Sequence, residues 1–360
     1  MTRVIGIDPG TVSIDLCGIE DGRVFLDRSL PTRAALTDPD AFVAILAASG
    51  PLDLIAGPSG YGLPLTSGPG VSDYDLSVAF LAAPGETGGI GGVRAVARVL
   101  ARSGLPVVFT PGVIHLTTVP DHRKVNRVDM GTADKVAVTA LAIDRQSRRE
   151  GIPPGEVSLV LVELGGAFTA TVAVAGGKIV DGIGGSAGPL GFQSAGGWDG
   201  EVAYLAGTVT KAALFGGGVR TVAGWDEARD PEDLAHPGTA REGIAREAFV
   251  EGVVKVVAAL GAVVPSPREI VLSGRLARVS AVRGALEDRL AASAPVHLLE
   301  GFASAAKEGA QGAALLADGL AGGSRRELVE VMQIREARGS ILDHLYVISR
   351  DTARQRLGLS

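Results

Sequence analysis

The sequence predicts an α/β protein built from two similar lobes, for three reasons. Short apolar segments suited to strands alternate along the chain with longer segments of helical periodicity. The stretch VIGIDPGTVSIDLCGIEDGRV at 4–24 aligns without a gap to LVLVELGGAFTATVAVAGGKI at 159–179, so that Asp8 matches Glu163. Each stretch also contains a Gly-centred hairpin, which adds antiparallel strands to the parallel ones that helical crossovers favour. We therefore expect two mixed sheets flanked by helices, with a cleft between the lobes.

The first half of the chain divides into alternating elements. Strands are predicted at 4–7, 14–19, 23–26, 52–56 and 107–110, and helices at 41–48, 93–103 and 136–143. Between them, residues 57–92 are dominated by Gly, Pro and Ser. A stretch of this length without secondary structure is usually functional or mobile. We therefore expect either a loop that covers a substrate, with Tyr61, Tyr74 and Asp75 as contacts, or a disordered insertion.

The second half repeats the opening strands and then adds helices. Strands are predicted at 157–163, 169–175, 178–182 and 269–272, and helices at 200–213, 239–260 and 276–292. Residues 301–320 are small, apolar and Ala-rich, which predicts a tightly packed helix. The lobes are expected at 1–150 and 151–323. A helical tail at 324–360 would pack on a lobe or mediate self-association.

Composition argues against several classes of protein. The 360 residues are 46% hydrophobic and 21% charged, which suits a chain with a buried core. The net charge is −6 and Lys and Arg form no dominant run, so we expect no nucleic-acid partner. The one cysteine, Cys17, cannot form an intrachain disulfide. No apolar stretch of about 18 residues is free of charge and no signal core precedes the first strand, so we expect a cytoplasmic protein without a membrane span.

The segment that follows the first strand has the residues of a phosphate-binding turn. Gly10 lets the backbone approach a ligand closely, while Thr11 and Ser13 offer hydroxyl and backbone donors to phosphate oxygens. Asp8, at the end of the strand, can hold Mg²⁺ through water, because Mg²⁺ keeps several waters beside phosphates. An ordinary tight turn is the alternative.

The second copy of this turn carries Glu163 as its acid. Gly165 and Gly166 allow consecutive backbone N–H groups to point toward an anion, and Thr169 adds a hydroxyl. The alternative is a structural duplication in which only one copy is active.

A third turn comes directly after a buried strand and before a helix. It consists of Ser273, Gly274 and Arg275. A turn at this position can hold an adenosine or a phosphate close to a helix N-terminus.

These motifs resemble, in their order, those of the superfamily of actin, sugar and acetate kinases and heat-shock chaperone ATPases. DPGT, VNRVDMGTADK with its helix, ELGG, LSGR and the Ala/Gly helix at 303–317 are similar to its two phosphate loops, two connecting helices and adenosine loop. The opening VIGIDPGTVSID and the stretch GGWDGEVAYL at 196–205 look most like the acetate and butyrate kinase branch, and in particular like an uncharacterised family of predicted butyrate kinases. Asp8 stands where butyrate kinases usually carry Asn, and GPLGFQSAGGWD lacks the Arg that carboxylate kinases carry.

The resemblance implies two actin-like (ribonuclease H-like) lobes with mixed five-stranded sheets and a nucleotide cleft between them. It implies ATP and Mg²⁺ as cofactors, with Asp8 and Glu163 holding the metal. Asp129 and Asp134, in the first connecting segment, are candidate bases or water-orienting groups, and Asp199 is a further candidate acid. Helix capping is the alternative for Asp134 and Asp199.

Charge neutralisation at the transferred phosphoryl group requires cations. The polar segment at 122–135 offers Arg123, Lys124, Arg127 and Lys135. The resemblance then implies a kinase that transfers the γ-phosphate to a carboxylate or hydroxyl of a small molecule, and it makes a homodimer plausible. A switch ATPase that acts on a protein partner is the second hypothesis, and a fold that binds without catalysis is the third.

Overall fold

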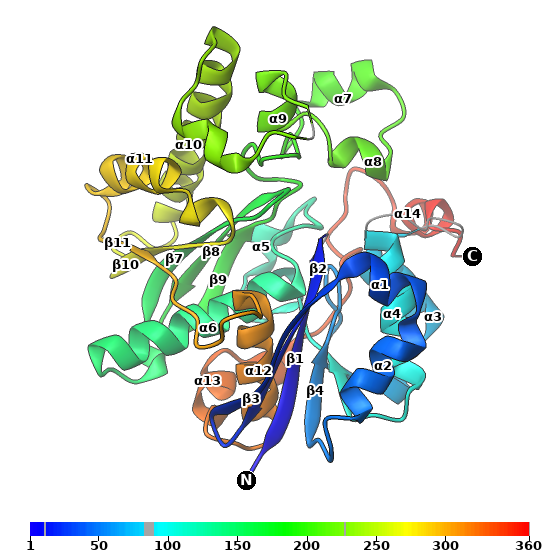
Figure 1. The fold of residues 1–360 in the computed structure, drawn as a ribbon. Helices are drawn as coiled ribbons and strands as arrows, with labels where there is room; N and C mark the ends of the chain where they lie inside the picture. Colours follow the sequence, from blue (N-terminus) through cyan, green and yellow to red (C-terminus); the bar gives the residue numbers. More distant parts are fainter. Residues whose placement is uncertain (11, 83–89, 227, 360) are drawn as a thin grey trace.

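The computed structural model describes residues 1–10, 12–82, 90–226 and 228–359, and it confirms the α/β class with two mixed sheets (Figure 1). The first sheet has the order β3-β2-β1-β4-β6-β5. Its strands are β1 (Arg3–Pro9), β2 (Ser13–Glu20), β3 (Arg23–Pro31), β4 (Leu54–Gly57), β5 (Thr66–Ser67) and β6 (Val107–Phe109). It therefore holds six strands, one more than expected, because the two-residue strand β5 pairs with β6.

The second sheet has the expected five strands, in the order β11-β10-β7-β8-β9. They are β7 (Ser158–Leu164), β8 (Thr169–Ala175), β9 (Lys178–Ile183), β10 (Glu269–Ser273) and β11 (Val296–Leu298). In both sheets the opening three strands are antiparallel and the later partners of the first strand are parallel. The two sheets therefore share one plan.

Helices cover both sheets, and several differ from the predicted spans. They are α1 (Thr32–Thr37), α2 (Pro39–Ala47), α3 (Asp73–Phe80), α4 (Ile90–Arg102), α5 (Asp121–Lys124), α6 (Ala133–Glu150), α7 (Gly200–Ala206), α8 (Lys211–Leu214), α9 (Val219–Ala223), α10 (Ala240–Gly261), α11 (Ser280–Leu290), α12 (Glu308–Leu320), α13 (Arg326–Val331) and α14 (Arg350–Arg356). The helix expected at 200–213 is wrong as one unit, because it is divided at Gly207, whose φ is 71°. The helix expected at 301–320 begins only at Glu308.

The Gly-rich stretch at 57–92 is more ordered than the sequence predicts. It contains β5 and α3, and α3 begins at a reciprocal cap in which Ser72 accepts from the Asp75 N–H and Asp75 accepts from the Ser72 N–H. Local capping supplies the start signal that hydrophobic periodicity does not show. Residues 83–89 lie outside the described part of the chain.

The last long helix, α12, packs between α6 and the first sheet (Figure 1). Small residues make this approach possible. A Cβ on Gly6 of β1 would lie 2.2 Å from the Ala314 backbone nitrogen, and one on Gly312 would lie 1.8 Å from the Ala137 carbonyl oxygen. The tight packing expected for this segment is therefore present, and it fixes the N-terminal end of α12 beside β1.

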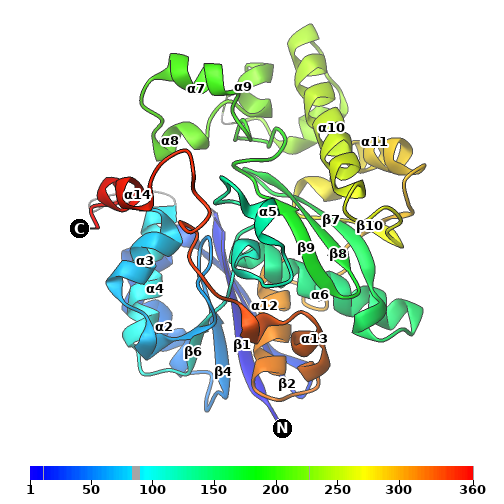
Figure 2. The same ribbon diagram turned by 180° about the vertical axis from the view of Figure 1, so that it is seen from behind.

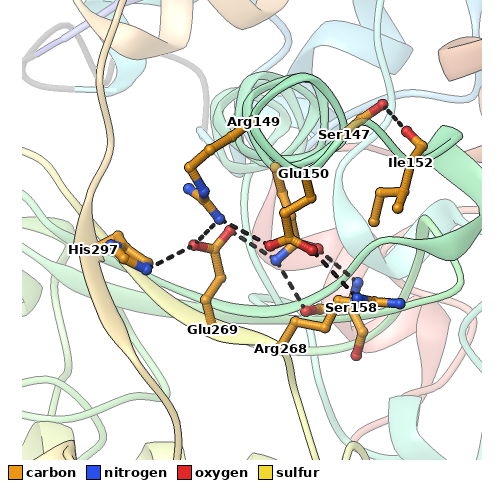
Figure 3. A network of polar contacts seen from close by, with 9 residues as sticks. Ser147, Arg149, Glu150, Ile152, Ser158, Arg268, Glu269 and His297 are labelled. Atoms are coloured by element: carbon orange, nitrogen blue, oxygen red, sulfur yellow. Dashed lines mark hydrogen bonds and ion pairs between the residues drawn. The ribbon is translucent and has the colours of Figure 1, made fainter.

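The C-terminal end of α6 is fixed to the second sheet by a polar network (Figure 3). Glu269, at the start of β10, is 1% exposed and accepts from Gln146 Nε2 at 2.8 Å and Arg149 Nη2 at 2.5 Å. His297 approaches the same carboxylate at 3.7 Å. A buried carboxylate needs such partners, so α6 is held at this end while its N-terminal end faces the first lobe.

The tail forms a strap along one side of the molecule (Figure 2). After α13, which packs on α12, the chain returns to the segment before α6, where Asn126 Oδ1 accepts from the Tyr346 and Val347 N–H groups. It ends in α14, where the Arg354 guanidinium lies 5.5 Å from the centre of the Tyr74 ring of α3. In the described part of the chain, the helices are too short or too polar to cross a membrane.

Candidate active site

The two acids of the sequence repeat meet at the N-terminal end of α6. Lys135, in the first turn of that helix, places Nζ 2.6 Å from a carboxylate oxygen of Asp134 and 3.1 Å from one of Glu163. Asp8 lies close enough to Asp134 and Lys135 for their charges to act on it. The fold therefore brings Asp8 and Glu163, the two equivalent acids of the repeat, close to the ammonium group of Lys135.

Burial sets the electrostatics of this cluster. Burial first, and then the charge of the neighbouring Asp134, raise the pKa of Asp8 to about 7, against the lowering effect of Lys135 and Lys307. Burial likewise raises the pKa of Glu163 against the opposing effect of Lys135. For Asp134, burial is outweighed by the Lys135 ammonium, so the pKa falls below its usual value. The cluster thus combines an ionised Asp134 with a partly protonated Asp8 at neutral pH.

The Asp134 side chain is turned toward the cluster and away from the helix cap. It does not fill the capping position before α6, which Thr132 occupies, and the Thr132 hydroxyl donates to it. Its side chain instead faces Lys135 and lies near Asp8 and Glu163. Of the two alternatives for this residue, the geometry favours a role in the cluster.

The first turn of the repeat is closed by a backbone hydrogen bond. The Gly10 N–H donates to the Ser13 carbonyl oxygen at 2.8 Å, and a Cβ on Gly10 would lie 2.8 Å from that same oxygen. The Ser13 hydroxyl lies 2.5 Å from Lys307 Nζ, and Lys307 is also 3.2 Å from Asp15. Thr11, the remaining predicted residue of this turn, lies outside the described residues.

The second turn has the same backbone and a different surface. The Gly165 N–H donates to the Phe168 carbonyl oxygen at 2.9 Å, while a Cβ on Gly166 would meet no atom within 4 Å. Gly166 therefore presents an open backbone. Thr169 is completely buried and its hydroxyl donates to the Leu190 carbonyl at 3.4 Å, away from the acids.

The third predicted turn lies directly against the second. Gly274 has φ 88°, and a Cβ there would lie 2.5 Å from the Leu164 carbonyl oxygen and 3.0 Å from Glu163 Oε1. Ser273 is 1% exposed, and its hydroxyl has no hydrogen-bond partner among the described residues. The Arg275 side chain turns outward to Asp230, at 2.8 Å. Ser273 and Gly274 therefore join the site, and Arg275 borders it.

Two of the predicted acids have hydrogen-bond partners other than Lys135. Asp129 is 9% exposed, and its Oδ2 accepts from both the N–H and the hydroxyl of Ser186 at 2.9 Å, which ties the segment before α6 to the loop after β9. Asp199 is exposed and accepts from the Glu201 N–H at 2.8 Å at the start of α7, so it occupies a helix cap.

The predicted cations are also divided. Lys135 is central, whereas Arg123 donates to the Val180 carbonyl and Lys124 to the Leu116 carbonyl. Lys307 and Glu308, at the start of α12, are close to the cluster and were not predicted. The dipeptide Lys-Glu ahead of an Ala/Gly helix was the available signal, but only the packing of α12 on β1 shows its meaning.

The donor set suits a nucleotide with Mg²⁺. Its groups are hard carboxylate oxygens at two strand ends, exposed backbone at a Gly turn, and the buried Ser273 hydroxyl that lacks a partner among the described residues. Three or more acidic, His or Cys side chains do not gather into a direct metal-binding group anywhere in the described ranges. Mg²⁺ on phosphates commonly takes only one or two carboxylates, so the two findings are compatible.

Comparison with known proteins identifies the family. Residues 6–347 match the family described as "Protein of unknown function (DUF1464)". The chain belongs to this family. None of the curated protein sequences matches it.

Solved structures show the same two-lobe fold. A propionate kinase from Francisella tularensis has a TM-score of 0.63 at 14% identity, with 87% of this chain and 98% of that chain covered. Acetate kinase from Entamoeba histolytica has a TM-score of 0.59 at 12% identity, with 81% and 86% covered. A Listeria monocytogenes protein proposed to be an N-acetylmannosamine kinase reaches 0.51 at 12% identity, with 91% and 99% covered. This chain therefore has the same two-lobe α/β fold as these solved structures.

Proposed function

We propose that this protein is an ATP-dependent phosphotransferase that acts on a small molecule, as its resemblance to acetate and butyrate kinases implies. The observation that carries the proposal is the meeting of Asp8, Asp134 and Glu163 around Lys135. This arrangement places opposite charges where two Gly turns converge, and phosphoryl transfer depends mainly on such positioning and charge neutralisation.

The residues divide the work as follows. Asp8 and Glu163 would hold Mg²⁺ through water, and the metal when bound would neutralise phosphate charge. The turns at Gly10 and at Gly165 and Gly166 would bind phosphates by backbone N–H groups, with Ser273 and Gly274 on the adenosine side. Asp134 would orient the acceptor or take its proton, and Lys135 would keep Asp134 ionised.

The acceptor would bind between the lobes, beside Tyr61. The Ser186 side chain hydrogen-bonds the Tyr61 hydroxyl, and Lys211 of α8 lies 5.4 Å from the centre of the Tyr61 ring. Tyr61 comes from the first lobe, whereas Ser186 and Lys211 come from the second. An amphipathic ring with a nearby ammonium suits a short acceptor with an anionic or hydroxyl end, which is the class that the resemblance implies.

A homodimer is also proposed, and exposed apolar side chains support it. Val202, Tyr204 and Leu205 of α7 are 53%, 79% and 80% exposed, and Tyr346 and Val347 of the tail are 72% and 82% exposed. Light scattering of the purified protein would give the mass directly. A monomer at micromolar concentration would contradict this part of the proposal.

The deciding experiment measures nucleotide binding and then acceptor-dependent ADP release. The wild type should bind Mg²⁺-ATP and release ADP faster with one member of a panel of short carboxylates and polyols. Slow ADP release that no acceptor stimulates would instead indicate a switch ATPase, and absence of binding would overturn the proposal.

Two variants test the assigned roles. Asp8→Asn should weaken Mg²⁺-ATP binding while the fold is retained, and Asp134→Asn should keep binding but lower kcat about 100-fold or more. Asp351→Asn, on the exposed side of α14, is the matched control and should change neither. Unchanged nucleotide binding in Asp8→Asn would contradict the assignment of the first turn as a phosphate-binding turn.

A further inference from the structure

The start of α12 brings an ammonium group onto the first turn of the repeat. Lys307 Nζ lies 2.5 Å from the Ser13 hydroxyl and 3.2 Å from Asp15, and a Cβ on Gly10 would be 3.5 Å from it. Its side chain is 50% exposed, although Asp15 is fully buried. Lys307 therefore covers the turn and remains open to a ligand from solvent.

The backbone before Lys307 is held in place by a carboxylate. Asp27 of β3 accepts from three consecutive N–H groups, those of Ser304, Ala305 and Ala306, at 2.7 to 3.0 Å. Against the cost of partial burial, these donors lower the pKa of Asp27 below its usual value, so it is ionised at neutral pH. The ammonium of the next residue is thus directed by a rigid segment rather than by a free loop.

Asp15 is the carboxylate that pairs with the Lys307 ammonium group. Its Oδ2 is the atom near Lys307 and accepts from Ser13 at 3.0 Å, whereas its Oδ1 is buried without a hydrogen-bond partner among the residues that the structure describes. A carboxylate buried in this way requires a nearby cation. The corresponding position of the second copy, Ala170, has no charge to balance.

The helices α6 and α12 each bring a lysine to one turn of the repeat. α6 packs on the second sheet, and its Lys135 pairs with Glu163. α12 packs on the first sheet, and Lys307, the residue before its first turn, pairs with Asp15 at the first turn of the repeat. Each lobe therefore receives one ammonium group from the start of the helix that covers its sheet. Lys135 is engaged by two carboxylates, whereas Lys307 is engaged by one carboxylate and a hydroxyl.

We propose that Lys307 is a phosphate-binding residue of the nucleotide site, held by Asp15 and Ser13 in the free protein and donating to the nucleotide phosphates on binding while it stays paired with Asp15. The proposal rests on the function proposed above. A phosphate at the first turn offers two or more charged oxygens to an ammonium that is already within reach, and such charge-assisted bonds are stronger than the bond to a serine hydroxyl. Asp27 acts as a positioning residue by fixing 304–306.

Calorimetric titration with Mg²⁺-ADP and Mg²⁺-ATP tests this. Lys307→Met should bind both nucleotides about tenfold or more weakly, because one charged contact is lost. Lys307→Arg should recover part of the affinity. Lys255→Met, which removes an exposed lysine paired with Glu251 on α10, is the matched control and should bind as the wild type does.

A double variant separates phosphate binding from simple neutralisation of Asp15. Asp15→Asn with Lys307→Met removes the acid and its cation together, so no buried charge is left unpaired. If Lys307 binds phosphate, the double variant stays at least about tenfold weaker than Asp15→Asn alone. Equal nucleotide affinity in these two variants would overturn the inference, and it decides the matter even if Lys307→Met alone does not fold.

The wild-type titration keeps the two proposals distinguishable. A wild type that does not bind Mg²⁺-ADP or Mg²⁺-ATP overturns both. A wild type that binds, together with a Lys307→Met variant that binds equally well, overturns only the role of Lys307. For Asp27→Asn we expect weaker Mg²⁺-ADP binding with no change in the dissociation constant for adenosine, and a loss of both would contradict a positioning role.

Discussion

The two hairpins of the repeat have the same backbone and different side chains. In each, a hydrogen bond from the Gly N–H to the carbonyl oxygen three residues later closes the turn. Each also has a β-bulge at the equivalent place, between Gly18 and Ile19 in the first copy and between Ala173 and Val174 in the second. Even the second turn agrees, because its two central residues have positive φ in both copies. The duplication has therefore preserved conformation more strictly than chemistry.

The chemical difference lies in the residues that follow each Gly turn. In the first copy, Ser13 and Asp15 form a polar site that holds Lys307. In the second, the equivalent positions are Phe168, which packs edge-on to Phe215 with 4.9 Å between ring centres, and the buried Ala170. The first turn is thus built around a cation and the second around an apolar anchor, so the proposed nucleotide would meet two unlike turns.

The largest expected effect comes from placing an acid equivalent to Asp15 of the first copy at the matching position of the second copy, Ala170. Ala170→Asp would bury a carboxylate at a position that is 1% exposed and directly opposite Glu163 in the β7–β8 pair, so two acids would share the one ammonium group of Lys135. We expect a loss of about 3–5 kcal/mol in the free energy of unfolding, as for other uncompensated buried charges. Urea unfolding would measure it. Ala170→Val is the control for size, and an equal loss in both variants would show that volume and not charge decides.

The two strand-end acids should share a pH dependence of the same sign. The pKa of Asp8 rises from 3.8 to about 7 on folding, so between about pH 4 and 7 the folded protein binds a proton that the unfolded chain does not. Stability from this group is therefore lost as pH rises through that window and is constant above it. The slope is at most about 1.4 kcal/mol per pH unit.

Asp8→Asn isolates this contribution, because it removes the titrating group and leaves the others. Measured without metal, the wild type should lose more stability than the variant between pH 4 and 7. Glu163→Gln should show the same sign, since burial raises the pKa of Glu163 as well. Parallel curves for wild type and Asp8→Asn would contradict a raised pKa at this position.

The repeat itself explains how much of the site the sequence could predict. Strand-end acids and Gly turns are local patterns, so Asp8, Gly10, Glu163 and Gly165 could be recognised from residue type and spacing. The α/β class follows from the same local alternation of strands and helices, and the structure confirms it.

What could not be predicted depends on contacts between distant segments. Lys307 reaches Ser13 and Asp15 only because α12 crosses back to the first sheet, over a sequence separation of more than 290 residues to Ser13. Asp129 matched the sequence pattern of a site residue, but its partner is Ser186 in the other lobe, which no local pattern reveals. The sixth strand depends on a two-residue pairing that is too short to give a periodic signal.

A smaller effect tests whether the turns are equivalent as backbone. A Cβ on Gly10 would lie 2.8 Å from the Ser13 carbonyl oxygen, and one on Gly165 would lie 2.9 Å from that of Phe168. Gly10→Ala and Gly165→Ala should therefore cost similar amounts, about 1–3 kcal/mol, through overpacking. Thermal unfolding compares them directly. Gly166→Ala, where a Cβ meets open space, should stay within about 0.5 kcal/mol.

The smallest effect concerns the second turn of the first hairpin, where the copies differ at one residue. Asp21 and Gly22 have φ of 47° and 80°, and their equivalents Gly176 and Gly177 have 58° and 68°. A Cβ on Gly22 would meet nothing within 4 Å, so Gly22→Ala should cost only the left-handed backbone strain, about 1 kcal/mol. Asp21→Gly should cost no more than about 1 kcal/mol, because it removes the exposed hydrogen bond that Asp21 Oδ1 accepts from the Thr2 N–H, while the relief of backbone strain is offset by the flexibility that glycine adds to the unfolded chain. A loss well above about 2 kcal/mol for Gly22→Ala in urea unfolding would mean that this turn is held by contacts beyond its own conformation, and that the hairpins differ in more than their side chains.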